Sequence, residues 1–371
     1  MGQCVVIGSG ILGASIAYHL AKAGVDVTIV DRHDCGQATD AGAGIICPWL
    51  SERRSRSWHR LTQGGARFYP KLIRALAADG QTDTGFAQVG AIYLHTDATR
   101  LKEMEDRAKR RRREAPEMGE IARLSPAETQ ALFPPLSERY ASLHISGGAR
   151  VDGRLLRDAL INAAKRYGAS YKQGDARLVH QDRRVTGVTI NGERISGEMV
   201  ILAAGVWAND VLESLGVRMS VRPKKGQIVH LKMPDADTSR WPVVRTPDGP
   251  YLLAFDGGRI VVGATHEDEA GYDTRVTAGG MWELLKKALD VAPGLYSSTW
   301  LETRVGLRPY TPGALPAVGW LPGYEGLVVA NGLGAFGLTV GPYLGSEIAK
   351  WVQGQPTELD FSAYDLSKAL G

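Results

Sequence analysis

A glycine-rich turn between two apolar strands constrains the fold of this chain more than any other feature. The apolar run Cys4–Ile7 is typical of a buried parallel strand, and Gly8–Gly13 follows it with the pattern G-x-G-x-x-G. A helical pattern comes next, and Gly24 stands where a helix C-cap glycine belongs. A second strand, Val25–Val30, leads to Asp31. This order of strand, turn, helix and strand predicts a unit that binds an adenine dinucleotide, without saying which one.

The turn and the acid each have a chemical role in such a unit. Glycines permit a tight turn and a close backbone approach, so a pyrophosphate can sit at the N-terminus of the helix. Asp31 lies 18 residues beyond Gly13, where its carboxylate can accept hydrogen bonds from a ribose. Arg32 could receive the 2′-phosphate of NADP, but Asp31 would repel that phosphate.

Composition excludes few classes of protein. The 371 residues are enough for two domains, and 44 basic against 40 acidic residues give a net charge of only +4. We therefore expect no nucleic-acid partner. The densest basic run, Lys109–Arg113, is interpreted either as a solvated helix or loop face or as a docking patch.

Cysteines and targeting signals suggest an intracellular setting. Cys4, Cys35 and Cys47 form neither a C-x-x-C pair nor a metal-ligand spacing, so no metal site is expected. The first strand begins within three residues of Met1, which leaves no room for a signal peptide, and no apolar run is as long as a membrane span. We expect a cytoplasmic protein, either free or peripheral at the inner face of the membrane.

The rest of the chain alternates irregularly between helix and strand signals. We predict a mostly helical, charged region over residues 51 to 140, a helix over 151–168, and hairpin strands with a turn at Asn191-Gly192. A buried strand follows around residues 200–202, and residues 221 to 265 are rich in strands. The chain ends with charged and apolar helices over residues 277–291 and 338–352. These signals favour an α/β fold with an α+β part and interwoven domains.

Four further motifs carry a resemblance to a known family. They are the small-residue loop Ala38–Gly44, the helix entry Val151-Asp152-Gly153, the turn Ala203–Trp207, and Gly306–Pro312 followed by Pro316–Gly319. Together with the N-terminal turn, they resemble the FAD-dependent D-amino-acid oxidase and glycine oxidase superfamily over nearly the whole chain. That superfamily includes D-amino acid dehydrogenase and sarcosine oxidase-like enzymes.

The resemblance implies non-covalently bound FAD and a discontinuous division of the chain. The Rossmann-like FAD-binding domain would comprise residues 1–50, 145–220 and 300–371. It would be interwoven with a β-sheet-based substrate-binding domain of residues 51–144 and 221–299. The expected cofactor-binding residues are Gly8, Gly10, Ile11, Leu12, Gly13, Asp31, Arg32, Thr39, Ala43, Gly44, Ile45, Ala176, Ala204, Gly205, Trp207, Arg308, Gly332, Gly334, Ala335, Phe336, Gly337, Leu338 and Thr339. Asp40 departs from the family, which usually has asparagine there.

The resemblance also implies three catalytic residues. Arg308 stands at the family's carboxylate-binding position, and Tyr251 would give the carboxylate a second anchor. His266 stands where the family has methionine, and it either accepts a proton from the substrate ammonium or faces solvent at a strand end. Phe336 replaces a second arginine found in glycine oxidases and would make that wall apolar.

The expected activity is dehydrogenation of an amino acid or secondary amine that carries a carboxylate. Hydride would pass to flavin N5, and the imine would hydrolyse to a 2-oxo acid. Alternatives are a 2-hydroxy acid dehydrogenase of the same superfamily, the catalytic flavin subunit of a hetero-oligomeric amine, opine or proline dehydrogenase, and a redox-silent nucleotide-binding protein. The sequence leaves open whether O2 or a quinone or carrier accepts the electrons, and whether the protein is a homo-oligomer or needs a partner subunit.

Overall fold

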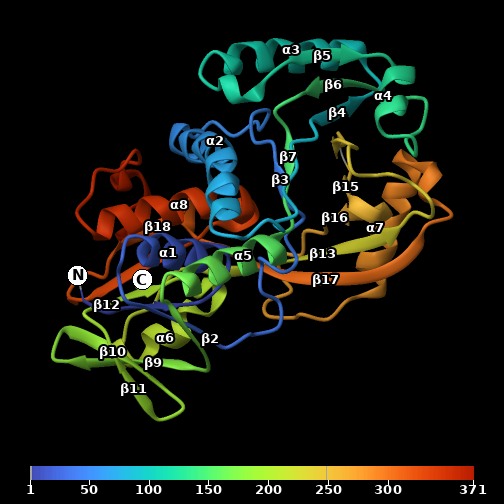
Figure 1. The fold of residues 1–371 in the computed structure, drawn as a ribbon. Helices are drawn as coiled ribbons and strands as arrows, with labels where there is room; N and C mark the ends of the chain where they lie inside the picture. Colours follow the sequence, from blue (N-terminus) through green and yellow to red (C-terminus); the bar gives the residue numbers. More distant parts are fainter. Residues whose placement is uncertain (1, 248) are drawn as a thin grey trace.

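Two β-sheets organise the chain, and segments that are distant in sequence lie side by side in each of them (Figure 1). The computed structural model describes residues 2–247 and 249–371. The first sheet has six strands in the order β18 (Ala317–Trp320), β19 (Leu327–Asn331), β12 (Met199–Leu202), β1 (Cys4–Ile7), β2 (Val27–Asp31) and β8 (Ser170–Gln173). All neighbouring pairs are parallel except β18 with β19.

Side chains on the two faces of β1 explain its continuous apolar sequence. Cys4 and Val6 pack into a core shared with α1 (Ile11–Lys22), α5 (Gly153–Arg166) and α8 (Gly337–Val352). Val5 and Ile7 point to the opposite face, into a second core. A strand buried on both faces has no polar positions, which is why the first strand was recognisable from sequence.

A small sheet covers the second face of the six-stranded sheet. It consists of β11 (Glu193–Ser196), β10 (Arg184–Ile190) and β9 (Ala176–Gln181), and it shares its core with α6 (Ala208–Leu212). The antiparallel pair β10–β11 is joined at Asn191-Gly192, so the predicted hairpin is confirmed.

The second large sheet has eight strands and carries the other half of the cavity described below. Their order is β17 (Thr299–Tyr310), β13 (Arg222–Lys232), β16 (Arg259–Gly263), β15 (Tyr251–Phe255), β14 (Val243–Arg245), β4 (Ala91–His95), β6 (Ala141–Ile145) and β5 (Ile121–Leu124). The helix α7 (Ala278–Val291) covers one face through Leu284, Ala288 and Val291. The opposite face turns toward the large core that contains α1 and α8.

The region of residues 51 to 140 is less helical than the sequence predicts. It does contain α2 (Arg56–Ala78), α3 (Ala98–Arg112) and α4 (Pro126–Leu132), but β4 and β5 lie between them. β5 has only partly buried and exposed residues, so it lacks the apolar alternation that would reveal a strand. The two-stranded sheet of β3 (Ile45–Ile46) and β7 (Ala149–Arg150) connects this region to the large core (Figure 1).

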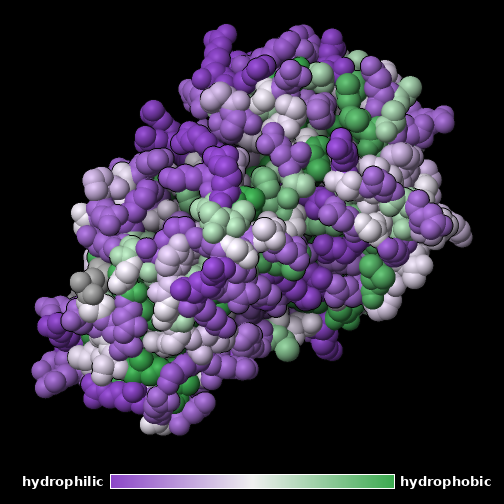
Figure 2. Space-filling model, in the orientation of Figure 1, coloured by the Kyte–Doolittle hydropathy of each residue, from purple (hydrophilic) through white to green (hydrophobic). Residues whose placement is uncertain are grey.

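The basic run at the end of α3 has a structural use. Lys109 pairs with Glu105 at 2.5 Å, and Arg111 donates hydrogen bonds to the carbonyl oxygens of Trp49 and Ser51. Hydrophilic side chains cover most of the face in Figure 2, with hydrophobic ones in scattered groups. Within the described part of the chain, no helix is long and apolar enough to cross a membrane.

The division into FAD-binding and substrate-binding parts stays a proposal. The segments assigned to FAD supply all six strands of the first sheet. They also supply most of β17, which pairs with β13 in the eight-stranded sheet. In that pairing Arg222 lies opposite Tyr310 at one end and Lys232 lies opposite Thr299 at the other. β17 is therefore the strand that the two parts share.

Candidate active site

A cavity of about 1100 Å³ lies between the two large sheets and collects most of the predicted residues. Its wall includes Gly8, Gly10, Ile11, Leu12, Asp31, Arg32, Thr39, Ala43, Gly44, Ile45, Ala176, Ala204, Gly205, Trp207, Tyr251, His266, Arg308, Gly334, Ala335, Phe336, Gly337, Leu338 and Thr339. Gly13 and Gly332 are the predicted residues that do not line it. A side chain at Gly13 would collide with the carbonyl oxygen of Gly8, and one at Gly332 with Thr311, so both glycines permit close packing behind the wall.

The glycine-rich turn brings the backbone close to the cavity. Gly8 has a φ of +97°, and a Cβ there would lie 2.5 Å from the carbonyl oxygen of Ala203. α1 begins at Ile11, and the amide of Ile11 donates a 2.9 Å hydrogen bond to the Thr39 hydroxyl. The open backbone and the helix N-terminus together form a cradle suited to a pyrophosphate.

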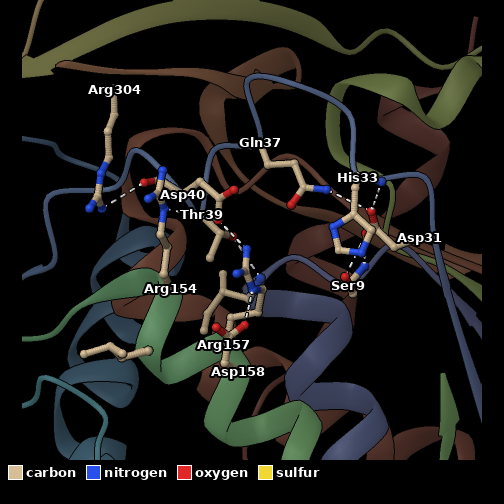
Figure 3. Close-up of polar contacts among 12 residues, drawn as sticks. Ser9, Asp31, His33, Gln37, Thr39, Asp40, Arg154, Arg157, Asp158 and Arg304 are labelled. Atoms are coloured by element: carbon tan, nitrogen blue, oxygen red, sulfur yellow. Dashed lines mark hydrogen bonds and ion pairs between the residues drawn. The ribbon is translucent and has the colours of Figure 1, made fainter. Parts of the chain in front are cut away.

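Asp31 is held in place at the end of β2 (Figure 3). Its carboxylate accepts hydrogen bonds from the backbone amide and hydroxyl of Ser9 at 2.5 and 2.9 Å, from the His33 amide at 2.7 Å, and from Gln37 Nε2 at 2.9 Å. These contacts fix the acid beside the turn, where a ribose is expected. The hydrogen bonds from His33 and Gln37 hold the loop after β2 against the end of that strand.

Arg32 is already matched by acidic side chains. Its guanidinium lies 2.8 Å from Asp34, 3.2 Å from Asp175 and 2.9 Å from Asp210. A 2′-phosphate at this position would meet three carboxylates in addition to Asp31. The surroundings of Arg32 therefore disfavour NADP, in agreement with the sequence argument.

Asp40, the departure from the family pattern, forms an ion-pair cluster behind the small-residue loop. Its carboxylate pairs with Arg157 and lies 3.9 Å from Arg154, both on α5, and Arg304 donates a 3.3 Å hydrogen bond to its carbonyl oxygen (Figure 3). Arg157 is also paired with Asp158 at 2.8 Å. Asp40 thus ties the loop to α5 and to β17.

Arg308 lies across the eight-stranded sheet toward the cavity. It is on β17, and its Nη1 donates to the carbonyl oxygens of Lys225 and Thr265, each at 3.3 Å. A Cβ on Gly226 would lie 2.5 Å from Arg308 Cζ, so the guanidinium occupies the space above that glycine. Only a residue without a side chain leaves room for it.

Tyr251 lies above a second glycine on the same sheet. It pairs with Gly263 across β15 and β16, and a Cβ on Gly263 would lie 2.8 Å from the Tyr251 hydroxyl. Burial raises the pKa of the Tyr251 phenol, while the charges of Arg308 and Arg245 act in the opposite direction. Tyr251 is therefore a neutral hydrogen-bonding group beside two cations. Gly226, Gly263 and Arg245 were missed from sequence, although a glycine inside a strand does signal a close approach.

His266 follows β16 at the exposed edge of the cavity. Partial burial and the charge of Arg308 lower the pKa of its imidazole. The side chain is therefore neutral at pH 7 and has an acceptor nitrogen. His266 lines the cavity and is also exposed to solvent, so its role as a proton acceptor stays a prediction.

Part of the remaining wall is formed by Cys47 and Phe336. Phe336 makes an edge-to-face contact with Trp58, with ring centroids 4.7 Å apart. Cys47 is buried, and desolvation raises the pKa of its thiol, so the reactive thiolate is disfavoured. Within residues 2–247 and 249–371, no cluster of His, Cys, Asp and Glu could hold a metal ion.

The residues of this cavity fit an adenine dinucleotide with a redox-active ring. A cradle for a pyrophosphate and an anchored acid for a ribose lie at one end. Arg308 and Tyr251 lie on the other sheet, beyond the loop that contains Gly44 and Ile45. The chemistry of the donor set therefore matches the FAD expected from the motifs.

Comparisons with known proteins extend over the whole chain. The model of the DAO family, described as FAD dependent oxidoreductase, matches residues 3–351. The uncharacterized oxidoreductase YurR of Bacillus subtilis (strain 168) is 55% identical over 371 residues, which are 100% of both chains. The crystal structure of iminodiacetate oxidase from Chelativorans sp. BNC1 has a TM-score of 0.94 and 45% identity, covering 98% of each chain. Glycine oxidase of Pseudomonas putida is 30% identical over 352 residues, covering 92% of this chain and 91% of the relative.

Proposed function

Because this chain belongs to the DAO family of FAD-dependent oxidoreductases, we propose that it oxidises an amino acid or secondary amine that carries a carboxylate. The family match confirms the resemblance drawn from the motifs, and the cofactor is FAD. When bound, FAD supplies the two-electron acceptor for this chemistry. Non-covalent binding is part of the proposal, supported by the buried thiol of Cys47.

The observation that carries the proposal is the position of Arg308. Its guanidinium reaches the cavity wall and, among the described residues, faces carbonyl oxygens rather than a carboxylate. A guanidinium binds a carboxylate through two parallel hydrogen bonds, which fixes both distance and orientation. Tyr251, partly buried beside it, can donate a further hydrogen bond to the same group. This pair would orient the carbon that bears the carboxylate.

Oxidation of the amine needs one further proton acceptor. The substrate ammonium loses one proton and its carbon loses a hydride, which leaves an iminium ion. Water then hydrolyses the iminium ion to a 2-oxo acid and releases an ammonium ion or a protonated amine. His266 is neutral at pH 7 and lies at the solvent edge of the cavity, so it would take the proton from the ammonium and pass it to water.

The named relatives support the same substrate class. One relative acts on glycine and another on iminodiacetate, by their names, and both compounds contain nitrogen next to a carbon that carries a carboxylate. We extend that shared chemistry to this chain. The apolar contact of Phe336 with Trp58 would exclude water from the opposite wall.

Anaerobic mixing tests the proposal directly. The purified yellow protein is mixed with glycine, sarcosine, iminodiacetate, proline, D- and L-amino acids and 2-hydroxy acids while the visible flavin band is followed. Bleaching by one amine class is the expected result, and recovery on admitting air would identify an oxidase. Bleaching by hydroxy acids alone would overturn the proposal, and so would a protein that no amine bleaches.

A further inference from the structure

The cationic side chains around the cavity fall into two groups. Six lysine or arginine residues line it, and four of them face a carboxylate at 2.6 to 3.0 Å: Arg32 with Asp34, Arg100 with Glu103, Arg107 with Glu52, and Lys287 with Glu283. Within the described ranges, neither Arg245 nor Arg308 has a carboxylate partner. The proposed function uses Arg308 and leaves Arg245 without a role.

Arg245 and Arg308 lie at the same cavity as Tyr251 and come from strands on either side of β15. Arg245 ends β14, the strand next to β15, and its Cζ lies 5.9 Å from the centroid of the Tyr251 ring. Arg308 comes from β17, on the far side of β16 and β13, and reaches over Gly226. Tyr251 therefore stands between two cations, and the charges of both influence its hydroxyl.

A partly buried guanidinium without a counterion is unfavourable, because it has lost water without gaining a partner. Arg245 is partly buried at the wall of the same cavity that Arg308 enters. Among the described residues Arg308 contacts carbonyl oxygens and Arg245 the Tyr251 ring, and neither has a counterion, so one ligand with two negative charges would neutralise both.

We infer that the substrate carries a second carboxylate, which Arg245 binds while Arg308 holds the carboxylate next to the reacting carbon. This inference rests on the proposed function and narrows its substrate class to amines with two carboxylates. Two kinds of compound have this chemistry: secondary amines with two carboxyalkyl arms, and α-amino acids with an acidic side chain. Arg245 is the residue that would distinguish them from glycine, sarcosine or alanine.

Binding of redox-inert acids tests the inference without turnover. Succinate and butyrate have the same carbon number and differ in one carboxylate, and each is titrated into the oxidised holoenzyme while the flavin spectrum is followed. We expect succinate to bind more tightly than butyrate, and Arg245→Gln to reduce that preference about 10- to 100-fold, as expected for a charge-assisted hydrogen bond. Arg245→Lys, which keeps the charge, should retain part of the preference.

A matched control is available on the same cavity wall. Arg100 is already paired with Glu103 at 3.0 Å, so Arg100→Gln should keep the succinate preference of the wild type. Equal binding of succinate and butyrate by the wild type would overturn the inference. An Arg245→Gln variant that retains the wild-type preference would overturn it as well.

Kinetics separate this inference from the proposed function. Sarcosine and iminodiacetate differ by one carboxylate, as do alanine and aspartate, so these pairs identify which kind of amine is used. Arg245→Gln should raise KM for the dicarboxylate of the active pair far more than it lowers kcat. If no amine bleaches the flavin but the succinate preference depends on Arg245, the proposed function fails and the second carboxylate site stands. If amines bleach the flavin and Arg245→Gln does not change the dicarboxylate preference, the proposed function stands and the second carboxylate site fails.

Discussion

The guanidinium of Arg308 occupies the space that a side chain on Gly226 would fill. The two residues are on neighbouring strands, with Lys224 opposite Arg308 and Gly226 opposite Gly306 in the β13–β17 ladder. A Cβ on Gly226 would lie 2.5 Å from Arg308 Cζ. The position of the proposed substrate anchor therefore depends on a residue that has no side chain.

Gly226→Ala should displace Arg308 and weaken substrate binding. We expect KM for a carboxylate substrate to rise about tenfold or more, because a displacement of about 1 Å removes bidentate geometry. Steady-state kinetics on the purified variant checks this. Gly279→Ala is the matched control, since a Cβ there meets no atom within 4 Å. Equal KM values in the two variants would contradict the role given to Gly226.

Arg308→Ala should act mainly on binding of the carboxylate. Loss of a charge-assisted pair is worth about 1.5–3 kcal/mol, which corresponds to an increase in KM of about 10- to 150-fold. Arg308→Lys should recover only part of the loss, because an ammonium cannot form the planar two-bond contact. Kinetics with a carboxylate substrate, compared with its methyl ester, measures the effect. An Arg308→Ala variant with wild-type kinetics would exclude Arg308 as the anchor.

His266 should give the pH profile its acidic limb. Burial and the charge of Arg308 lower the pKa of its imidazole below the usual 6.5. The imidazole therefore becomes protonated, and stops acting as a proton acceptor, as the pH falls through this lowered pKa. His266→Gln should reduce kcat/KM at pH 7 about 100-fold and flatten the acidic limb. Measurement of kcat/KM between pH 5 and 9 tests this. A profile identical to that of the wild type would mean that His266 is a solvent-facing side chain without a catalytic role.

His230 should make stability depend on pH. Burial, with the charge of Arg304, lowers its pKa to about 4, and neither ring nitrogen has a hydrogen-bond partner among the described residues. The unfolded imidazole binds a proton below about pH 6.5, whereas the folded one does so only near pH 4. The free energy of unfolding should therefore fall as pH falls through this window, by up to about 1.4 kcal/mol per pH unit.

The comparison with His230→Leu isolates this contribution. The leucine variant fills a similar volume and cannot titrate, so its Tm should decrease less than that of the wild type between pH 7 and pH 5. Thermal melts of the two holoproteins at both pH values provide the measurement. Parallel decreases would show that His230 does not contribute to the acid sensitivity.

Asp40 should stabilise the loop that lines the cofactor end of the cavity. Asp40→Ala removes the partner of Arg157, which should cost about 1–3 kcal/mol of stability and promote loss of FAD. Asp40→Asn keeps a hydrogen-bond acceptor and should retain most of the stability and most of the bound FAD. Thermal melts and the flavin content after gel filtration compare the variants. Asp158→Asn serves as the control, because Asp158 is the more exposed of the two carboxylates on Arg157. An effect of Asp158→Asn as large as that of Asp40→Ala would contradict this account.

Local patterns account for the parts of the fold that were predicted well. The predicted first strand has the bounds of β1, and α8 begins one residue before the predicted start at 338. β2 begins two residues later than predicted, at Val27. These elements combine apolar periodicity with glycine punctuation, and both signals lie within one short window. β5 was missed because its side chains are only partly buried or exposed, so its sequence resembles a loop.

The sequence by itself indicated a dinucleotide site and, through the family resemblance of its motifs, FAD and Arg308 as the candidate carboxylate anchor, because those motifs are contiguous. Only the tertiary structure decided which side chains surround that anchor. Gly226, Gly263 and Arg245 meet Arg308 and Tyr251 through the register of five neighbouring strands, in the order β17, β13, β16, β15 and β14. Strand register depends on long-range pairing, and no local pattern in the sequence specifies which residues will lie opposite one another.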